Sequence, residues 1–554
     1  MPRARSRLGC DECRRRRRKC DEKQPACRRC TSAGRDCRYT LRIVVNRDPT
    51  VIDLNDGNDD DDDDNDKHAN DSAEIARVNN LLTTAAFTVS RLPNGVPLAP
   101  PYRRLLDYFA RDVLASLSVH PVIHSDLAQG LVPAMLHEPH LLSAGLALAA
   151  AGLASRGLVD VGGIDLMRVI AHLQTSGLSL LRKVVAEAEN ETDERHLPAT
   201  CLLWCLADVF AADASASSWR IHLRGIKALL GGAKALDAFV TRGRGGTLTL
   251  SASASSSSSS SRSAMGHLAR LYLSLQTLPH VARRRRQQAS TEDSETDQTA
   301  ATESDHVIGE EAAAMDKPGP MIDGFLGCSE ELFEIMQHVE QVASTLPPMT
   351  ASQDIVDDID TDDTGDALST FTAPHLTGPA RVTADMLLQR VQALVLLDAD
   401  DNPTPNITNI SLEALTPAAA REFALCHGCF QQATLVHIYR RLFRLPSRSP
   451  LIQQGVSEIQ RMASQMTQGT ACSTWVAMAL PLFTAGCEAF TLSSQEWAHE
   501  AVAALLASIG SRHVQLLQRA LEDVWRLRER RGDTEGRLCA GQLLDELNYN
   551  IILF

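Results

Sequence analysis

The sequence has few aromatic residues, no long apolar run and no recognisable catalytic motif. Aromatic residues make up 4% of the 554 residues, and alanine and leucine dominate the apolar set, a composition that favours helices over sheets. No segment reaches the ~18 uninterrupted apolar residues that a membrane span requires; the longest candidate, 141–154, predicts a buried core helix instead. The apolar segment of a secretory signal is missing, as are a glycine-rich phosphate loop and a nucleophile elbow. We therefore expect neither a membrane partner nor enzyme activity.

Cysteine is concentrated near the N-terminus. Without an export signal the thiols should stay reduced, so clustered cysteines are interpreted first as metal ligands. Six of the 14 cysteines fall within residues 10–37, where they form two copies of the pattern Cys-x-x-Cys, six residues, Cys. The six are Cys10, Cys13, Cys20, Cys27, Cys30 and Cys37. A repeat this short indicates two equivalent half-sites.

The number of cysteines predicts how many metal ions they hold. Structural zinc takes four ligands in a tetrahedron, and each half of the repeat supplies three thiolates. Two zinc ions can share six thiolates only if two of the thiolates bridge both metals, and the symmetric choice is Cys10 and Cys27. Such a cluster carries a net charge of about −2, so any attraction to a polyanion must come from the residues around it.

The same region is strongly basic. Residues 1–47 contain 16 Lys and Arg against 5 Asp and Glu, a net charge of +11, which leaves −25 for the rest of the chain. Five arginines and a lysine fill the space between Cys13 and Cys20, enough for about one and a half helical turns. Their mutual repulsion is relieved when phosphates approach, so the expected partner is nucleic acid. Single-stranded RNA fits poorly because Tyr39 is the only aromatic residue among the first 86.

Residues 9–39, GCDECRRRRRKCDEKQPACRRCTSAGRDCRY, resemble the fungal six-cysteine zinc binuclear cluster of many transcription factors. The resemblance implies two zinc ions, bridging by the first and fourth cysteines, double-stranded DNA as partner, and location in the nucleus. It also implies that Arg16 and Arg17 reach a CGG-like triplet in the major groove. The family often has lysine at the second of these positions, yet arginine can donate two bonds to guanine. The residues expected to contact phosphates are Arg14, Arg18, Lys19, Arg28 and Arg29.

The composition divides the chain into four parts. These are the zinc cluster at 8–40, an acidic and disordered linker at 48–72, an apolar series at 73–92, and a helical body at 100–545. The series at 73–92 fits either a short dimerisation helix, which would make the protein a homodimer, or a helix packed on the body. Low-complexity insertions interrupt the body near 247–264, 283–314 and 350–375.

The body shows apolar residues at helical spacing. One such stripe comprises Leu202, Leu203, Leu206, Val209 and Phe210. The segments LLDYFARDVLASLS, EPHLLSAGLALAA, SSWRIHLRGIKALL and WVAMALPLFTAGCEAF resemble the fungal-specific regulatory domain, which implies an all-helical fold that governs activity. Cys426 and Cys429 spell a Cys-x-x-Cys within a helical stretch, where we expect core packing and not metal chemistry.

Together these patterns predict a mostly α protein, with a small zinc cluster domain joined by disordered linkers to a large all-α regulatory domain. The function that follows is regulation of RNA polymerase II transcription, of a metabolic or secondary-metabolite gene set. Contact with the transcription machinery or co-regulators and control by a small-molecule effector are part of this expectation. The alternative is a zinc-binding scaffold for protein interactions; such modules usually include histidine, and none occurs before His68.

Overall fold

The computed structural model describes most of the body and a few residues of the N-terminal cluster. The described residues are 13, 16, 27–33, 98–187, 196–211, 218–229, 264–275, 320–346, 375–394, 406–547, 549, 551 and 553. Several sequence predictions lie outside this set: the acidic linker at 48–72, the apolar series at 73–92, and nearly all of the three insertions.

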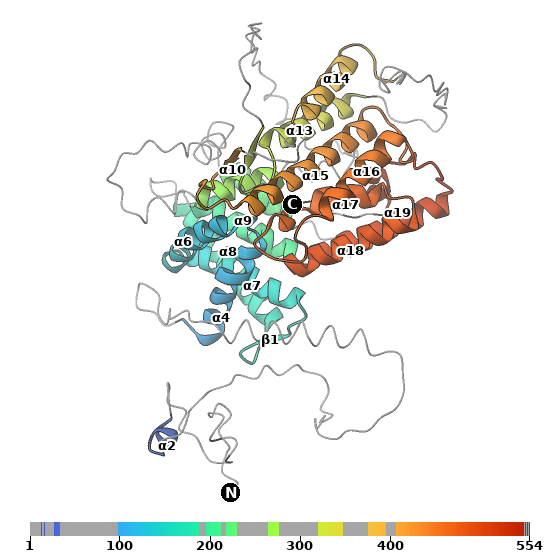
Figure 1. Ribbon diagram of the computed structural model, residues 1–554. Helices are drawn as coiled ribbons and strands as arrows, with labels where there is room; N and C mark the ends of the chain where they lie inside the picture. Colours follow the sequence, from blue (N-terminus) through green and yellow to red (C-terminus); the bar gives the residue numbers. More distant parts are fainter. Residues whose placement is uncertain are drawn as a thin grey trace, which may run out of the picture.

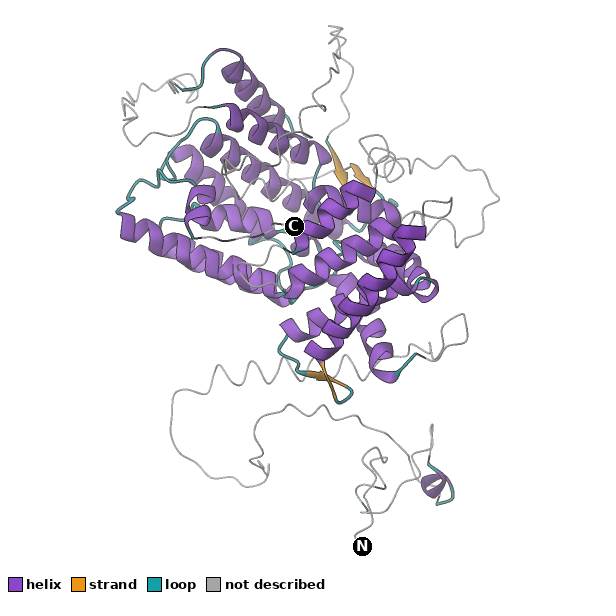
Figure 2. Ribbon diagram, turned by 180° about the vertical axis from the view of Figure 1, so that it is seen from behind, coloured by secondary structure: helices purple, strands orange, loops and turns teal. Residues whose placement is uncertain are grey.

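Helices form almost all of the regular structure in the described part of the chain (Figures 1 and 2). The N-terminal half of the body contains α4 (Pro100–Tyr108), the π-helical turn η1 (Phe109–Val113), α5 (Leu114–Ser116), α6 (Pro121–His137), α7 (Pro139–Ser155), α8 (Leu166–Glu187), α9 (Leu197–Ala211) and α10 (Trp219–Leu229). The C-terminal half contains α13 (Glu330–Thr345), α14 (Gly378–Gln392), α15 (Pro417–Arg441), α16 (Pro450–Ala463), the 3-10 turn η3 (Thr474–Ala477), α17 (Ala479–Cys487), α18 (Leu492–Ile509), α19 (Arg512–Arg531) and α20 (Ala540–Glu546). A further helical segment covers 264–275, and the short helix α2 (Arg28–Thr31) belongs to the N-terminal region. The expected mostly α fold is confirmed.

The strands within the described residues are short and lie at the periphery of the helices. β1 (Asp160–Val161) pairs antiparallel with β2 (Ile164–Asp165) in the hairpin before α8. β3 (Met321–Asp323) pairs parallel with β4 (Asn406–Thr408), so that Ile322 lies opposite Ile407. The second pair brings together segments that are far apart in the sequence.

Helix α7 is the centre of the N-terminal half. Every residue from His140 to Leu153 is buried, and the helix packs against α4, α6, α8 and α9. The prediction of a buried core helix at 141–154 is therefore confirmed. Among the residues that the structure describes, none of the helices combines the length and the apolar character that a membrane span needs.

Helix α9 is more deeply buried than its apolar stripe predicted. The stripe suggested one face toward the core, but the residues from Leu197 to Ala207 are all buried, including Thr200. The reason is that α9 lies between α7, α10 and α19, so neighbouring helices cover its other faces as well.

Helix α15 has the corresponding place in the C-terminal half, where it packs against α13, α14, α16 and α17. Its His427 is fully buried: the Nδ1 atom accepts a hydrogen bond from the backbone N–H of Ser329 at 3.2 Å, and the Nε2 atom donates to the carbonyl of Leu394 at 2.9 Å. Burial lowers the pKa of His427, because the charged imidazolium would lose its hydration. The neutral ring thus joins three elements.

A buried carboxylate fixes the helical segment 264–275. Asp323, in β3, accepts hydrogen bonds from the backbone N–H groups of Phe325 and Leu326 at 2.8 and 3.1 Å. The guanidinium of Arg270 donates to the same carboxylate, and both side chains are at least nine-tenths buried. The ion pair ties the segment to the strand across 53 residues of chain.

One continuous apolar core extends from Leu98 to Leu553 and joins the two halves of the body. In Figure 1, α4 to α9, in blue and cyan, form the lower left of the body, and α16 to α19, in orange and red, form its right side. Contacts between α9 and α19 cross the boundary between the two halves of the body. Two hydrogen bonds cross it as well: the backbone N–H of Cys472 donates to the carbonyl of Ala115 at 2.8 Å, and the hydroxyl of Ser155 donates to the carbonyl of Gly510 at 2.7 Å.

Helix boundaries follow from local sequence. Proline occupies the first turn of α4, α6, α7, α15 and α16, where its missing N–H has no helical partner to lose. Side chains of Ser329, Thr416 and Ser511 cap the starts of α13, α15 and α19. Gly510 and Gly532 end α18 and α19 in the left-handed conformation, with φ of 68° and 62°.

Candidate metal centre and nucleic-acid interface

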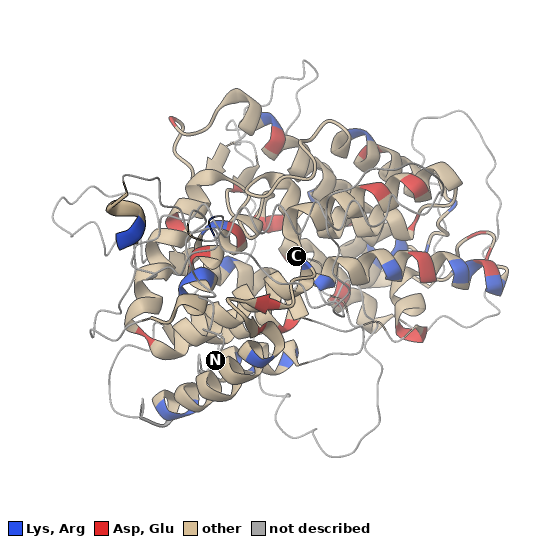
Figure 3. Ribbon diagram, turned by 90° about the horizontal axis from the view of Figure 1, so that it is seen from below, with Lys and Arg blue, Asp and Glu red and all other residues tan. Residues whose placement is uncertain are grey.

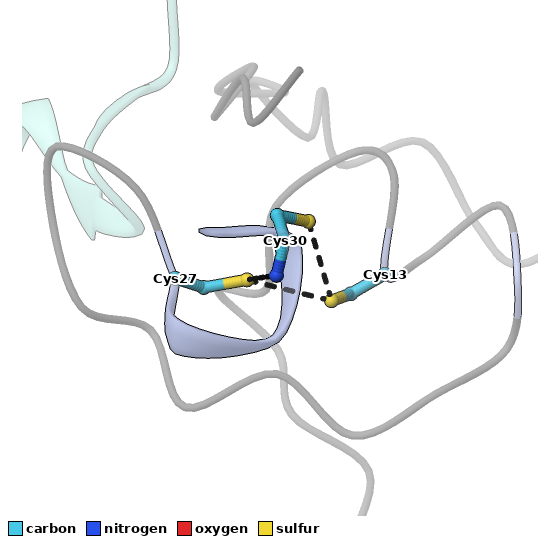
Figure 4. Close-up of side chains that lie close together, drawn as sticks. All are labelled: Cys13, Cys27 and Cys30. Carbon is cyan, nitrogen blue, oxygen red and sulfur yellow. Dashed lines mark hydrogen bonds between the residues drawn. The ribbon is translucent and has the colours of Figure 1, made fainter. Parts of the chain in front are cut away.

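Three of the predicted ligands come together in the N-terminal region. Figure 4 shows the sulfur atoms of Cys13, Cys27 and Cys30 turned toward one another. The Sγ atom of Cys13 lies 3.6 Å from that of Cys27 and 4.0 Å from that of Cys30, and all three lie within 4.8 Å of each other. Their exposed fractions are 3%, 0% and 2%. Residues from both halves of the cysteine repeat therefore share one buried cluster of sulfur atoms.

The spacing of these sulfur atoms fits a zinc site. Thiolates at about 2.3 Å from a tetrahedral zinc ion lie about 3.8 Å apart, which falls between the distances of 3.6 and 4.0 Å found here. A disulfide would require sulfur atoms about 2.05 Å apart, so the cluster is not an oxidised pair. Cys27, which ligand counting assigns as a bridge, lies 3.6 Å from the thiol of the other half of the repeat.

The first turn of α2 orients the sulfur of Cys27. Cys27 is the N-cap residue, and its Sγ atom accepts a hydrogen bond from the backbone N–H of Cys30 at 3.3 Å. Its carbonyl accepts from the backbone N–H and the hydroxyl of Thr31, both at 3.0 Å. A hydrogen bond to a ligand atom of this kind fixes the orientation in which the atom would meet a metal.

Thr31 contacts the N-cap residue Cys27, a contact that the sequence analysis missed. Its hydroxyl bonds back to the carbonyl four residues earlier, a local habit of threonine near helices. A threonine directly after a Cys-x-x-Cys, four residues beyond the capping cysteine, is the pattern that could have indicated it.

The described arginines of this N-terminal region are exposed. Arg16, Arg28 and Arg29 are all exposed, the last two on α2 next to Cys27 and Cys30. In Figure 3 the short helix α2 is partly blue, the colour of Lys and Arg, and has no red. The helical body shows both blue and red segments. The remaining predicted site residues lie outside the described part of the chain: Cys10, Cys20, Cys37, Arg14, Arg17, Arg18 and Lys19.

The other described cysteines have a different environment. Burial raises the pKa of Cys201 and of Cys472 to about 11, so both remain thiols at neutral pH. Cys426 and Cys429 are completely buried within α15, where their Sγ atoms lie 3.8 and 3.9 Å from the carbonyls of Thr474 and Ile459 and burial raises the pKa of both. Within the described residues, a cluster of three metal-ligating side chains occurs in the N-terminal region alone.

Comparisons with known proteins agree with this geometry. The family described as "Fungal specific transcription factor domain" matches residues 104–541, and the family described as "Fungal Zn(2)-Cys(6) binuclear cluster domain" matches residues 8–43. Such a cluster domain binds two zinc ions. "Sterol uptake control protein 2" of Saccharomyces cerevisiae is 50% identical over 48 residues, which are 8% of this chain and 5% of that protein. No solved structure matches the chain.

Proposed function

Because the chain belongs to the fungal specific transcription factor family, we propose that it reads a CGG-like triplet in duplex DNA and regulates RNA polymerase II transcription in the nucleus. That it is a DNA-binding transcription factor follows from its two domains. The finer assignments belong to the proposal: the triplet, the residues that read it, and a metabolic or secondary-metabolite gene set as target.

The convergence of Cys13, Cys27 and Cys30 carries the proposal. A peptide of this size has too few apolar residues to fold by burying a core, so metal binding supplies its folding free energy. We assign all six cysteines of the repeat as ligands of the two zinc ions, with Cys10 and Cys27 as the bridges. This assignment accounts for the burial of Cys27, which has no exposed surface.

Within the proposal the basic residues have two roles. Arg16 and Arg17 donate to guanine O6 and N7 atoms in the major groove, each such contact being worth about 1–3 kcal/mol of discrimination between bases. The phosphate-contacting residues are Arg14, Arg18, Lys19, Arg28 and Arg29, which position the cluster without specifying a sequence. The exposure of Arg16, Arg28 and Arg29 supports both roles, because their guanidinium groups are accessible to a duplex.

In the proposed function, the helical body receives regulatory signals and transmits them to the transcription machinery or co-regulators. Its net negative charge disfavours DNA as its own partner, since phosphates would be repelled. A small-molecule effector and a homodimer joined through 73–92 complete the proposal.

Selection of preferred duplexes from a random pool by the full zinc-loaded chain tests the proposal. We expect enrichment of a CGG-like triplet, and two triplets at fixed spacing if the chain acts as a homodimer. Arg17→Ala should relax the triplet preference, whereas Arg28→Ala should weaken binding to all duplexes by a similar factor. Each lost phosphate contact should also reduce the slope of log K against log salt by about 0.9.

The controls separate loss of contact from loss of fold. Both variants must retain two zinc ions per chain, because neither arginine is a proposed ligand. Enrichment of no sequence, or duplex binding that does not weaken as salt rises, would overturn the proposal.

A further inference from the structure

A cavity of about 250 Å³ opens at the C-terminal end of α19. It lies between α18, α19 and the connections that precede α16 and follow α17 and α19, all within the described residues. The lining residues that matter here are Arg448, Phe490, Trp525, Arg528, Glu529 and Asp533. The volume lies just below the roughly 300–1,000 Å³ of typical ligand sites, so an occupant must be small.

Two guanidinium groups lie close to one aromatic ring of this cavity. The guanidinium carbon of Arg448 lies 5.4 Å from the centroid of the Phe490 ring, and that of Arg528 lies 5.3 Å from the same centroid. Trp525 adds a second aromatic ring, whose Nε1 atom donates to the carbonyl of Gly486 at 2.8 Å, so its orientation is fixed. The cavity thus offers flat apolar surfaces next to positive charge.

The two guanidinium groups differ in how far they are already bonded. Arg528 is buried and already well bonded: its terminal nitrogens donate to the carbonyl of Cys487 and, at 3.3 Å, to that of Leu538. One of them also lies 3.7 Å from a carboxylate oxygen of the buried Glu488. Its Nε atom is buried without a hydrogen-bond partner. Arg448 is exposed, and no carboxylate of the described residues pairs with it. A ligand carboxylate would therefore find, at the mouth of the cavity, a guanidinium that no described carboxylate pairs with.

Two carboxylates balance these charges. Asp533 is held by the backbone N–H groups of Arg537 and Leu538, at 2.8 and 3.2 Å. Glu529 is exposed on the last turn of α19 and forms no ion pair with a described residue. With two cations and two carboxylates the lining has no net charge, so a purely anionic or purely cationic ligand would meet repulsion from half of it.

We propose that this cavity binds a free amino acid with an aromatic side chain. Its carboxylate pairs with Arg448, its ammonium group faces Glu529, and its ring packs against Phe490 and Trp525. Both charges of the ligand and its flat side chain then meet matching groups. The role of this ligand as an effector rests on the proposed function, whereas its binding to the body is measured without DNA.

Isothermal titration calorimetry of the full zinc-loaded chain tests the site with three probes: L-phenylalanine, 3-phenylpropionate and phenethylamine. We expect L-phenylalanine to bind with a Kd of about 10 μM to 1 mM, as befits about twelve non-hydrogen atoms. The two probes with a single charge should bind at least about tenfold more weakly, because each leaves one charged group of the cavity unpaired.

Variants locate the site. Arg448→Ala and Glu529→Gln should each weaken L-phenylalanine binding by about tenfold or more. Arg526→Ala is the matched control, since Arg526 is an exposed arginine of the same helix that pairs with Glu522 and Asp523 outside the cavity. It should change the Kd by less than about twofold.

Three results would overturn the site: no binding of L-phenylalanine, equal binding of 3-phenylpropionate, or unchanged binding by Arg448→Ala. Duplex binding is measured on the same samples. Loss of the ligand site with intact duplex binding refutes this inference alone, and the reverse outcome refutes the proposed function alone.

Discussion

Replacing Glu488 by glutamine should destabilise the body, because this buried carboxylate faces two buried guanidinium groups. The Nε atom of Arg440 donates to Glu488 Oε1 at 3.1 Å, and Nη2 of Arg528 lies 3.7 Å from Oε2. The hydroxyl of Ser447 donates to Oε2 as well. The side chains of Arg440, Glu488 and Arg528 are only 4–6% exposed, so water screens their charges little.

The size of the effect follows from this burial. Glutamine preserves the shape and one acceptor oxygen but removes the negative charge, leaving two buried cations without a counter-charge. Breaking a buried pair in this way costs about 3–5 kcal/mol. For a body of roughly 400 residues the unfolding entropy is about 0.8 kcal/mol/K, so Tm should fall by about 4–6 °C.

Thermal unfolding of the full chain, followed by far-UV circular dichroism, measures the difference. Glu458→Gln is the matched control: Glu458 pairs with Arg461 one turn away on α16, but the side chains are 37% and 52% exposed. An exposed pair at this spacing contributes about 0.5 kcal/mol or less, so Tm should change by less than about 1 °C. If Glu488→Gln lowers Tm no more than the control variant does, the assignment of a stabilising buried network is refuted.

Three further predictions concern other parts of the chain. Cys27→Ser should reduce bound zinc from two ions to fewer than one per chain by metal analysis, because both ions lose a ligand, whereas Cys201→Ser should retain two; equal metal content would contradict the bridging role. His427 has a lowered pKa in the fold, so its contribution to stability is complete above the unfolded pKa of about 6.5 and is lost as the pH falls through the folded pKa. His427→Asn should therefore flatten the dependence of Tm on pH between about pH 7 and 5. An unaltered profile would show that His427 does not contribute to this dependence. Asp323→Asn should leave Arg270 with only the longer contact to Glu330, at 3.7 Å, and should accelerate amide hydrogen exchange in 264–275 by about tenfold or more. Unchanged exchange would show that the ion pair with Asp323 does not hold this segment.

The parts of the fold that could be predicted are those encoded in short stretches of sequence. Six cysteines in a double pattern indicate a two-zinc cluster because ligand number and spacing are local properties. The apolar run at 141–154 indicates a core helix because no polar face interrupts it, and α7 is buried accordingly. The helical stretch around Cys426 and Cys429 offers no second ligand pair and so favours core packing, and the burial of both residues agrees with that interpretation.

The parts that could not be predicted depend on contacts between distant segments. Arg440 and Glu488 are 48 residues apart, and nothing in the surrounding sequence shows that they meet. The π-helical turn η1 is equally hidden, since its residues continue the apolar spacing of α4. In the fold the carbonyl of Ala110 in this turn accepts a hydrogen bond from His124 at 2.9 Å. Nothing in the sequence around His124 indicates this contact with a segment 14 residues earlier.

Arg528 connects the buried network to the proposed ligand cavity. Its terminal nitrogens bond to the network through Ser447 and to the carbonyl of Leu538, while its guanidinium stacks on Phe490 at the cavity. A ligand can shift a conformational equilibrium only if it binds one state more tightly than the other. Occupancy of the cavity would favour the state in which Arg448, Phe490 and the end of α19 are assembled. Because the network anchors that end to α15 and α17, any signal from the cavity would reach the centre of the C-terminal half through rigid, buried contacts.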